Sequence, residues 1–492
     1  MAAGVRWAGK GRTSSGTGDV VVARAGHVDR SKSASAVPTG EGPVHSGSVL
    51  AERSGRSAHS TEDVHREREP SSWERMLSGE NLLAALNRVE VNRGAPGVDG
   101  MTTAELRPWL LVHWPGVRAE LDAGIYRPAL VRQVIIPKPG GGARMLGVPS
   151  VLDRLIQQAI AQVLVPVFDP RFSGSSFGFR PGRSAHQAVR VARRAIEDGH
   201  RWVVDLDLDR FFDRVQHDVL MARVARRVSD RRVLKLIRRY LDAGIMVDGI
   251  RMPSAEGTPQ GSPLSPVLSN IMLDDLDQEL FRRGHRFVRY ADDVCVFVRS
   301  ERAAHRVLAS VTAVVEQRLK LKVNREKSKV VHARAVVLLG FGFYFARGGK
   351  VGIRVSPKAV KRLKDRLREL TSRRWSIAVD ERIAKVNRFT TGWMGYFQLA
   401  DGARLFRDLD KWLHRRMRQI RWKEWKLPKA RFRNLRALGV AEWKAREWAG
   451  SGKGYWRIAG SAVLQRALPS SYWDDLGLRM LKPTWQRLRS AR

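Results

Sequence analysis

The sequence has very little cysteine and no long apolar run. Only one of its 492 residues is cysteine, Cys295, so neither a disulfide framework nor a zinc site of paired cysteines can form within the chain. A single cysteine fits a reducing cytoplasm. No run of about 18 apolar residues is present, which argues against a transmembrane helix. The opening stretch MAAGVRWAGKGRTSSG lacks the apolar segment of a secretory signal.

Acidic residues are scarce relative to basic ones. The chain has 89 Lys and Arg against 49 Asp and Glu, a formal net charge of +40. A positive field of this size indicates a polyanionic partner, and nucleic acid is the usual one. A charged, solvated surface is the alternative, but acidic residues would then normally interleave. A membrane surface is disfavoured, because no large apolar face or lipidation signal accompanies the charge.

Composition divides the chain into four parts. Residues 1–72 are basic and rich in Gly and Ser, which predicts a mostly disordered extension. In residues 73–345, short β-like runs alternate with helical stretches, which indicates an α+β domain. Residues 346–445 are predicted to be α-helical, and residues 446–492 form a last small region.

The helical part has recognisable start signals. Ser356-Pro357 has the residues of a helix N-cap followed by its first helical position. The helix that it opens carries apolar residues at helical spacing and basic residues over much of the rest. Residues 408–426 are predicted to form a second basic helix.

Two stretches place acidic residues beside apolar runs that are typical of buried strands. In WVVDLDLDRFFDRV, alternation turns three acids to one face of a strand. These are Asp205, Asp207 and Asp209. In FVRYADDVCVFV (287–298), we expect the two apolar runs to form the arms of a hairpin, with Asp292 and Asp293 near the turn. If the two strands are neighbours in one sheet, Asp207, Asp292 and Asp293 converge.

Convergent carboxylates repel one another unless cations bind them. Hard oxygen ligands suit Mg²⁺, and two such ions about 4 Å apart could activate a primer 3′-hydroxyl and stabilise the leaving pyrophosphate. Taken alone, however, Asp292-Asp293 is better interpreted as a polar hairpin turn. The other motifs of the chain favour the metal site.

These motifs occur in the order found in one known family, and the chain resembles the group II intron reverse transcriptase/maturases from about residue 73 to its end. The blocks that carry the resemblance are NRGAPGVDGMT (92–102), VRQVIIPKPGGGARMLGVPS (131–150), DPRFSGSSFGFRPGRSAHQAV (169–189), DLDRFFD (207–213), GTPQGSPLSPVLSNIML (257–273), YADD (290–293), LKVNREKSK (321–329) and LLGF (338–341). Any one block is a weak signal, but eight in order are a strong one.

The resemblance implies a right-hand polymerase fold of fingers and palm, with an antiparallel palm sheet. An α-helical thumb/maturase region and a small C-terminal DNA-binding domain would follow. It implies that Asp207, Asp292 and Asp293 are the catalytic ligands of two Mg²⁺ ions. Asp205 and Asp209 are not carried over, and we expect them to be solvated or ion-paired.

The resemblance also places a nucleotide site. Lys138 and Arg144 flank the Gly-rich turn of PKPGGGAR and would contact the triphosphate, although alone this stretch is equally a surface hairpin. Phe212 would exclude a ribose 2′-hydroxyl, while Phe211 packs in the core. Gln260 of TPQG would line the pocket. Lys327 could also reach the site, but it is interpreted as a surface lysine.

The stretch between Lys411 and Glu447 is strongly basic, with thirteen Lys and Arg against three Glu. Its interleaved tryptophans could stack on bases, but core packing is the better interpretation for each of them. We assign RNA or template contacts to basic residues here and in the insertion block. They are Arg180, Arg415, Arg416, Arg418, Arg421 and Lys423.

The stretch VNRFTTGWMGYFQLAD (386–401) resembles the maturase-specific segment of the family. The implied function is an RNA-directed DNA polymerase that binds group II intron RNA to assist splicing. It would support mobility by target-primed reverse transcription, using an RNA template, a DNA primer, target DNA and dNTPs. A domesticated relative in DNA repair or phage defence, or a non-catalytic RNA chaperone, is the alternative.

Two further expectations follow from the resemblance. Many relatives end in a Cys-containing HNH endonuclease, and because this sequence stops at Arg492 with one cysteine far upstream, we expect no second-strand cleavage. We also expect a bacterial cytoplasmic protein that associates with the nucleoid when bound to target DNA, without a membrane partner. The oligomeric state stays open.

Overall fold

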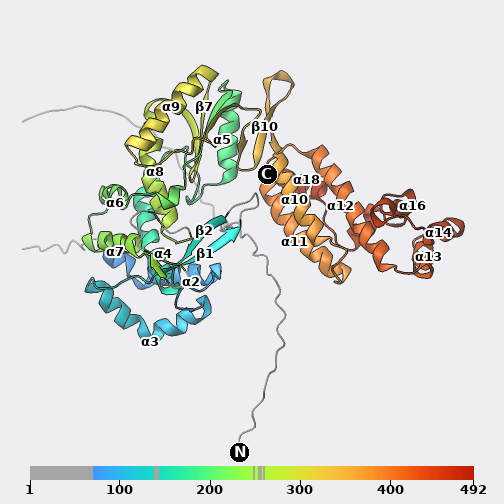
Figure 1. The fold of residues 1–492 in the computed structure, drawn as a ribbon, viewed down its shortest axis with the longest axis horizontal. Helices are drawn as coiled ribbons and strands as arrows, with labels where there is room; N and C mark the ends of the chain where they lie inside the picture. Colours follow the sequence, from blue (N-terminus) through green and yellow to red (C-terminus); the bar gives the residue numbers. More distant parts are fainter. Residues whose placement is uncertain (1–69, 138–142, 248–249, 253–256, 259–260, 492) are drawn as a thin grey trace, which may run out of the picture. The chain divides into compact units, whose positions relative to one another are not determined.

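A computed structural model describes residues 70–137, 143–247, 250–252, 257–258 and 261–491. The predicted extension, residues 1–72, therefore lies almost entirely outside the described residues. Residues 68–492 form one compact unit. Helices and strands alternate in its first part, and helices alone follow residue 355 (Figure 1).

Helices of the first part surround three small sheets. The helices are α1 (Ser72–Met76), α2 (Gly79–Asn92), α3 (Thr103–Asp122), α4 (Val151–Phe168), α5 (Ala185–Glu197), α6 (His217–Ala225), α7 (Arg231–Asp242), α8 (Ser265–Arg282) and α9 (Glu301–Gln317). The 3-10 turns are η1 (Asp169–Arg171), η2 (Phe211–Asp213) and η3 (Arg347–Gly349). The strands are β1 (Val131–Pro137), β2 (Ala143–Val148), β3 (Trp202–Leu206), β4 (Ile245–Val247), β5 (Ile250–Met252), β6 (Arg286–Tyr290), β7 (Asp293–Val298), β8 (Lys329–His332), β9 (Val337–Leu338), β10 (Phe341–Phe345) and β11 (Val351–Val355).

The sheet that carries the acidic motifs has the strand order β6-β7-β3-β8, and its neighbours are antiparallel. Its alternate residues are buried on opposite faces. Val204 and Val296 pack with α9 on one face, and Val203 and Phe297 pack with α5 on the other. Figure 1 shows β7 between α9 and α5. The two acidic strands are thus neighbours in one sheet, which is the condition for convergence of the acids that the sequence left open.

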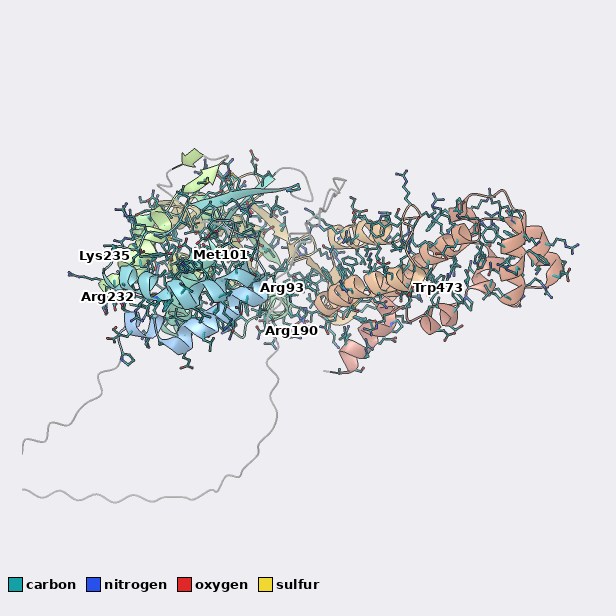
Figure 2. All side chains as sticks on the ribbon, turned by 90° about the horizontal axis from the view of Figure 1, so that it is seen from below. Arg93, Met101, Arg190, Arg232, Lys235 and Trp473 are labelled. Carbon is teal, nitrogen blue, oxygen red and sulfur yellow. The ribbon has the colours of Figure 1, made fainter. Side chains whose placement is uncertain are left out.

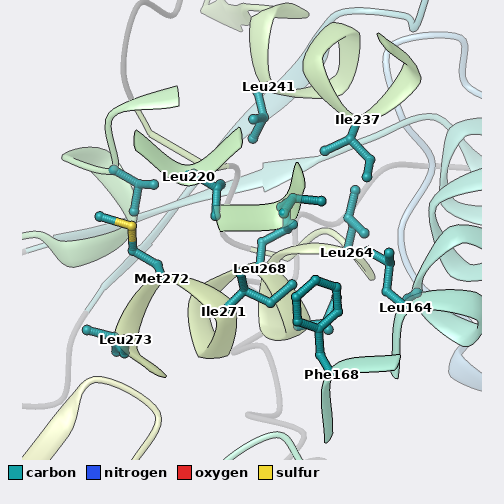
Figure 3. Packing of buried hydrophobic residues seen from close by; sticks show 14 of the residues in the cluster. Leu164, Phe168, Leu220, Ile237, Leu241, Leu264, Leu268, Ile271, Met272 and Leu273 are labelled. Carbon is teal, nitrogen blue, oxygen red and sulfur yellow. The ribbon is translucent and has the colours of Figure 1, made fainter. Parts of the chain in front are cut away.

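The largest apolar core of this part lies where α4, α6, α7 and α8 meet (Figure 3). Leu268 and Ile271 of α8 are one helical turn apart, so they face the same neighbours, which include Leu164 and Phe168 of α4. Among the described helices, α4 is long and apolar enough to cross a membrane, but most of its residues are buried within the protein. We therefore interpret α4 as a core helix, because a buried helix has no polar face.

Two further sheets flank this arrangement. One has the order β2-β1-β4-β5, with β1 and β2 paired antiparallel on either side of residues 138–142. The other has the order β11-β10-β9 and joins the first part to the helices that follow.

The region after residue 355 is entirely helical in the described residues. Its helices are α10 (Pro357–Leu370), α11 (Val379–Phe397), α12 (Ala403–Glu424), α13 (Pro428–Ala437), α14 (Glu442–Ala449), α15 (Tyr455–Ile458), α16 (Ala462–Ala467), α17 (Ser470–Asp475) and α18 (Leu481–Ser490). Ser356 caps α10 by accepting a hydrogen bond from the Ala359 backbone N–H at 3.3 Å, and Pro357 occupies the first helical position, as predicted. The helix predicted over 408–426 is α12, which starts earlier, at Ala403.

One core joins β10 and α5 to the helical region. The Tyr396 hydroxyl of α11 donates to the Leu339 carbonyl at 2.9 Å, and the Phe397 ring lies 5.1 Å from the Phe341 ring. The same core continues to Trp473 of α17, which is fully buried among the C-terminal helices (Figure 2). The aromatic residues of the maturase-like segment therefore pack inside the protein.

Candidate active site

The strand register brings two of the predicted acids side by side. In the antiparallel pairing of β3 with β7, Asp205 lies opposite Cys295 and Leu206 lies opposite Val294. The next position of this register, just beyond the end of β3, sets Asp207 opposite Asp293. Directly opposed residues point to the same face of a sheet. Both carboxylates therefore lie on the face that α5 covers, at the end of the sheet.

Asp292 lies in the tight turn that precedes Asp293. Tyr290 of β6 pairs with Asp293 of β7, which leaves Ala291 and Asp292 as a two-residue turn. The hairpin predicted from the sequence is thereby confirmed. Ala291 is buried and has a φ of 57°, in the left-handed region, where a residue with a Cβ is strained by about 1 kcal/mol or more.

Negative charge is concentrated at this end of the sheet. Partial enclosure by protein, and then the charges of Asp292, Asp205 and Asp207, raise the pKa of Asp293 to about 6. Burial also raises the pKa of Asp205; Lys329 opposes this shift and Asp207 adds to it. A carboxyl group whose pKa is raised by its acidic neighbours lies where a cation would be stabilised.

The donor chemistry fits a hard divalent cation, because carboxylate oxygens are the ligands that such ions prefer. Within the described part of the chain, however, no three His, Cys, Asp or Glu side chains are arranged so that they could hold a metal ion together. Asp207 instead makes an ion pair with Lys327, with 3.5 Å between its Oδ2 and Nζ. The structure thus brings Asp207 and Asp293 together and adds Asp292 beside them, without a closed set of three ligands.

The neighbouring acids behave as predicted. Asp205 pairs with Lys329 at 3.8 Å, and Asp209 pairs with Arg214 at 3.0 Å. Lys327, which was interpreted as a surface lysine, is exposed, but it also reaches Asp207. Its place on the loop before β8 puts it within reach of the end of β3, which was the alternative considered for it from the sequence.

The predicted nucleotide site is described only in part. Lys138 and Gln260 lie outside the described residues, and Arg144 lies on β2 opposite Ile136. Phe211 is buried in the core, as predicted, whereas Phe212 is half-buried with its ring 5.1 Å from that of Phe211.

Gly257 and Thr258, which precede Gln260 in the chain, are attached to the Phe212 segment. The Thr258 N–H donates to the Phe212 carbonyl at 2.6 Å, and the Gly257 N–H donates to the Val215 carbonyl at 2.8 Å. Gly257 has a φ of 99°, and a Cβ there would press against the Phe212 carbonyl. The backbone at the start of the TPQG wall is therefore fixed to the Phe212 segment.

The RNA contact predicted for two arginines is wrong, because both are buried. The Arg180 guanidinium donates to the Asp169 carboxylate at 2.7 Å and to the carbonyls of Ser173 and Ser176. The Arg418 Nε donates to the Ala459 carbonyl at 2.9 Å. Charged groups are buried only where such partners compensate for lost water.

The other predicted RNA contacts lie on α12 and are not buried. Arg415 donates to the Trp456 carbonyl and stacks on its ring at 4.2 Å. Arg416 donates to the Thr371 side chain and carbonyl, Arg421 pairs with Glu424, and Lys423 donates to the Arg373 carbonyl. RNA contact by these four residues stays a prediction. Of the α12 tryptophans, Trp422 is buried, as core packing predicts.

A buried polar group behind the acidic turn was not predicted. Arg289 of β6 and Asp277 of α8 form an ion pair with both side chains fully buried. Arg289 also donates to the Asn270 side chain and to the Ala291 carbonyl. A signal existed, because Arg289 interrupts an apolar strand and Asp277 adjoins the apolar stripe of Leu273, Leu276 and Leu280.

Two family models match the chain. Residues 136–343 match the model described as "Reverse transcriptase (RNA-dependent DNA polymerase)", and residues 360–439 match "Group II intron, maturase-specific domain". The first range contains Asp207, Asp292 and Asp293. The second range contains α11, α12 and α13.

Curated relatives agree with these models. The chain is 34% identical over 299 residues to Protein YkfC of Escherichia coli (strain K12), which covers 52% of this chain and 78% of YkfC. It is 33% identical over 212 residues to the Group II intron-encoded protein LtrA of Lactococcus lactis subsp. cremoris, which covers 43% of this chain and 34% of LtrA. The match thus spans about a third of LtrA. Among solved structures, a chain of a "Partial Cas6-RT-Cas1--Cas2 complex" matches at 26% identity with a TM-score of 0.34, covering 51% of this chain and 43% of that one.

Proposed function

From the premise that this chain belongs to the group II intron reverse transcriptase/maturase family, as an RNA-directed DNA polymerase with a maturase function, we propose that its catalytic centre is the end of the sheet β6-β7-β3-β8. The observation that carries this proposal is the register that sets Asp207 opposite Asp293, with Asp292 in the adjoining turn. Asp207, Asp292 and Asp293 would hold two Mg²⁺ ions.

The charges around the three acids suit both the bound ions and the reaction that these ions would support. When bound, the ions would supply charge stabilisation for the primer 3′-oxygen and the leaving pyrophosphate. Lys327 lies 3.5 Å from Asp207 and keeps positive charge beside this carboxylate. Burial and then repulsion by neighbouring acids raise the pKa of Asp293, and a bound cation would offset the repulsion.

The nucleotide would lie between the β1–β2 hairpin and the Phe212 segment. Lys138 and Arg144 flank the Gly-rich turn of that hairpin and would neutralise the triphosphate. The half-buried Phe212 ring would occupy the space of a 2′-hydroxyl, and Gln260 would line the pocket. The backbone bonds of Gly257 and Thr258 support this assignment, because they hold these two residues, which precede Gln260 in the chain, against the Phe212 segment.

Primer extension tests the catalytic assignment directly. We expect the wild-type protein to extend a DNA primer on an RNA template with Mg²⁺ and dNTPs, and Asp292→Ala to lose this activity. Asp209→Ala is the matched control, because Asp209 lies in the same segment but is paired with Arg214. Full activity in Asp292→Ala, with the same melting temperature as the wild type, would remove the acidic turn from the mechanism.

The finer layout follows from the same assignment. The sheet β2-β1-β4-β5 and its helices would be the fingers, and the sheet β6-β7-β3-β8 would be the palm. Helices α10 to α13 would form the thumb and maturase region, and residues 446–492 the DNA-binding region. Two apolar cores run through these parts: one is shared by the proposed fingers and palm, and the other joins the palm to the helical region.

Intron RNA is the partner proposed for the helical region. Exposed basic side chains support this on α10, where Lys358 and Arg362 are one turn apart on the same face. Cations on one helix face can follow a phosphate backbone without base specificity. The partner is tested by measuring splicing of the intron RNA with and without the protein, and unchanged splicing would refute the maturase assignment.

We also propose mobility by target-primed reverse transcription, with target DNA as a further partner and a cytoplasmic, nucleoid-associated location. The net charge of +40 supports binding to two kinds of nucleic acid. Incubating the protein and intron RNA with a labelled DNA duplex that carries the insertion site tests this. We expect cDNA joined to target DNA, and its absence under conditions that support primer extension would refute mobility.

A further inference from the structure

Buried polar side chains lie directly behind the turn that carries Asp292 and Asp293. Arg289 lies two residues before Ala291, and its side chain is on the α8 side of the sheet, with no exposed surface. Its Nε and Nη2 donate to the Asp277 carboxylate at 2.8 Å and 2.6 Å. This leaves Nη1 for other acceptors, since a guanidinium has five N–H groups in a planar fork.

The remaining nitrogen reaches the turn itself. Nη1 of Arg289 donates to the Ala291 carbonyl at 3.0 Å and to the Asn270 Oδ1 at 2.8 Å. Asn270 of α8 is in turn oriented by its Nδ2, which donates to the Gly178 carbonyl at 3.0 Å. The Ala291 carbonyl is therefore held by a side chain whose other bonds fix it to α8.

The backbone around Arg289 is fixed as well. Its N–H donates to the Ser175 carbonyl, and its carbonyl accepts from the Phe177 N–H, both at 2.9 Å. The segment 175–177 thus pairs with the outer edge of β6, while β7 pairs with its inner edge. Gly178 follows so closely that a Cβ there would overlap the backbone nitrogen of Ala291.

Ala291 is strained, with its φ of 57°, and strained residues persist only where their surroundings hold them. Ala291 is held by Arg289, whose side chain lies on the α8 side of the sheet, and by the close approach of Gly178. We propose that Arg289 is a positioning residue for polymerisation: through the Ala291 carbonyl it sets the place of the Asp292-Asp293 turn relative to Asp207. This inference rests on the proposed catalytic role of these carboxylates.

The test must separate positioning from mere stability, because deleting one partner of a buried ion pair can unfold the protein. The double variant Arg289→Met/Asp277→Leu removes both charges and keeps apolar volume, so it should fold. The variant Arg289→Lys keeps the charge beside Asp277 but loses the fork that also reaches Asn270 and Ala291. Both variants are compared with the wild type by thermal melting, primer-extension kinetics and Mn²⁺ binding measured by electron paramagnetic resonance.

We expect folded variants in which kcat falls by about 10- to 100-fold, as a misplaced catalytic group predicts. KM for the dNTP should change by no more than about twofold, and Mn²⁺ should bind more weakly. The matched control is Arg223→Met/Asp275→Leu, since Asp275 also lies on α8 and pairs with a largely buried arginine, at 2.9 Å. It should keep the wild-type kcat.

Each other outcome contradicts the proposal. Wild-type kcat and Mn²⁺ affinity in either folded variant would make the network structural only, and failure of both variants to fold would assign it to stability instead. An inactive wild-type protein would instead refute the polymerase assignment, so the two failures are distinguishable.

Discussion

Like charges gather in two places in this molecule, and the structure accommodates them differently. At the end of the sheet β6-β7-β3-β8, burial and then the charges of Asp292, Asp205 and Asp207 raise the pKa of Asp293 to about 6. On α12, arginines gather in the sequence just as densely, but their guanidinium groups donate to carbonyls of neighbouring elements, such as those of Ala459 and Trp456.

The difference indicates which charges are available to a ligand. A guanidinium bonded to buried carbonyls contributes to packing, because breaking those bonds leaves unsatisfied acceptors. Neighbouring carboxylates repel one another even where one of them is ion-paired, as Asp207 is with Lys327, and an added cation reduces this repulsion. Local environment, and not the number of like charges in the sequence, separates the acids proposed to be catalytic from the buried Arg418.

The largest effect is expected when Asp207 loses its charge. Asp207→Asn should lower the primer-extension rate by more than about 100-fold, because even residues outside the ligand set of a metal site cost 10- to 100-fold. The wild-type melting temperature should be kept, since Asp207 lies at the end of a strand and is partly exposed.

Asp209→Asn sharpens this result. It breaks a partly exposed ion pair with Arg214, which should cost at most about 1 kcal/mol of stability and little activity. Equal losses of rate in the two variants would show that the acids of this segment act together, against the assignment of Asp207 alone.

Substitutions of the two adjacent phenylalanines should likewise have different effects. Phe212→Ala should weaken discrimination against ribonucleotides by about tenfold or more, with a small change in stability. Phe211→Ala should lower the free energy of unfolding by about 3–5 kcal/mol, because Phe211 is buried. Primer extension with dNTPs and rNTPs, together with denaturant unfolding, measures both effects, and unchanged sugar selectivity in Phe212→Ala would contradict the assignment.

The arginines of α12 should behave unlike exposed cations of the same region. Arg418→Met should lower the free energy of unfolding by about 1–3 kcal/mol, because the Ala459 carbonyl loses its donor, with no change in RNA affinity per folded molecule. Lys358→Gln/Arg362→Gln should instead reduce the salt dependence of RNA binding by about one unit of slope per lost phosphate contact. Thermal melting and binding assays at several salt concentrations test both, and a lower RNA affinity in Arg418→Met alone would restore its predicted RNA contact.

The smallest effect is expected at Asp410, which accepts hydrogen bonds from the Leu481 and Lys482 N–H groups at the start of α18. Burial raises its pKa to about 6, the Lys482 charge and these bonds oppose this, and Asp474 adds to it. Because this carboxyl binds its proton more tightly in the folded state, its contribution to stability falls as pH rises from about 4 to about 6.

Asp410→Asn lacks this titration. The melting temperature of Asp410→Asn minus that of the wild type should therefore increase by a few degrees at most from pH 4 to pH 7. Melting curves of both proteins in matched buffers provide the measurement. A pH-independent difference would show that Asp410 keeps an ordinary pKa in the folded protein.

Much of the sheet β6-β7-β3-β8 could be predicted because its signals are local. Alternation along β3 and the two short arms around Asp292 are properties of neighbouring residues, and they were enough to predict a strand and a hairpin, whereas the pairing of β3 with β7 was only a condition. The burial of Phe211 was predicted from the motif in which this residue lies. The start of α10 was predictable for the same reason, since a cap depends on two or three consecutive residues.

The roles of the arginines could not be predicted, because a guanidinium can reach either solvent or a carbonyl of a distant segment. Arg418 and its acceptor Ala459 are 41 residues apart. Arg289 and Asp277 were missed for the same reason, since the pairing of a strand residue with a helix residue appears only once α8 is packed on the sheet. A charged residue within an apolar pattern indicates burial but does not identify its partner.

The shared core between β10 and α11 has a practical consequence for dissecting the protein. A cut between the two family-model matches, after residue 343 and before residue 360, would divide a core that includes Phe341, Phe343, Met394 and Phe397. Both fragments would then expose apolar surface and tend to aggregate. Polymerase and maturase functions should therefore be separated by point substitutions, and two fragments produced together should be soluble where each alone is not.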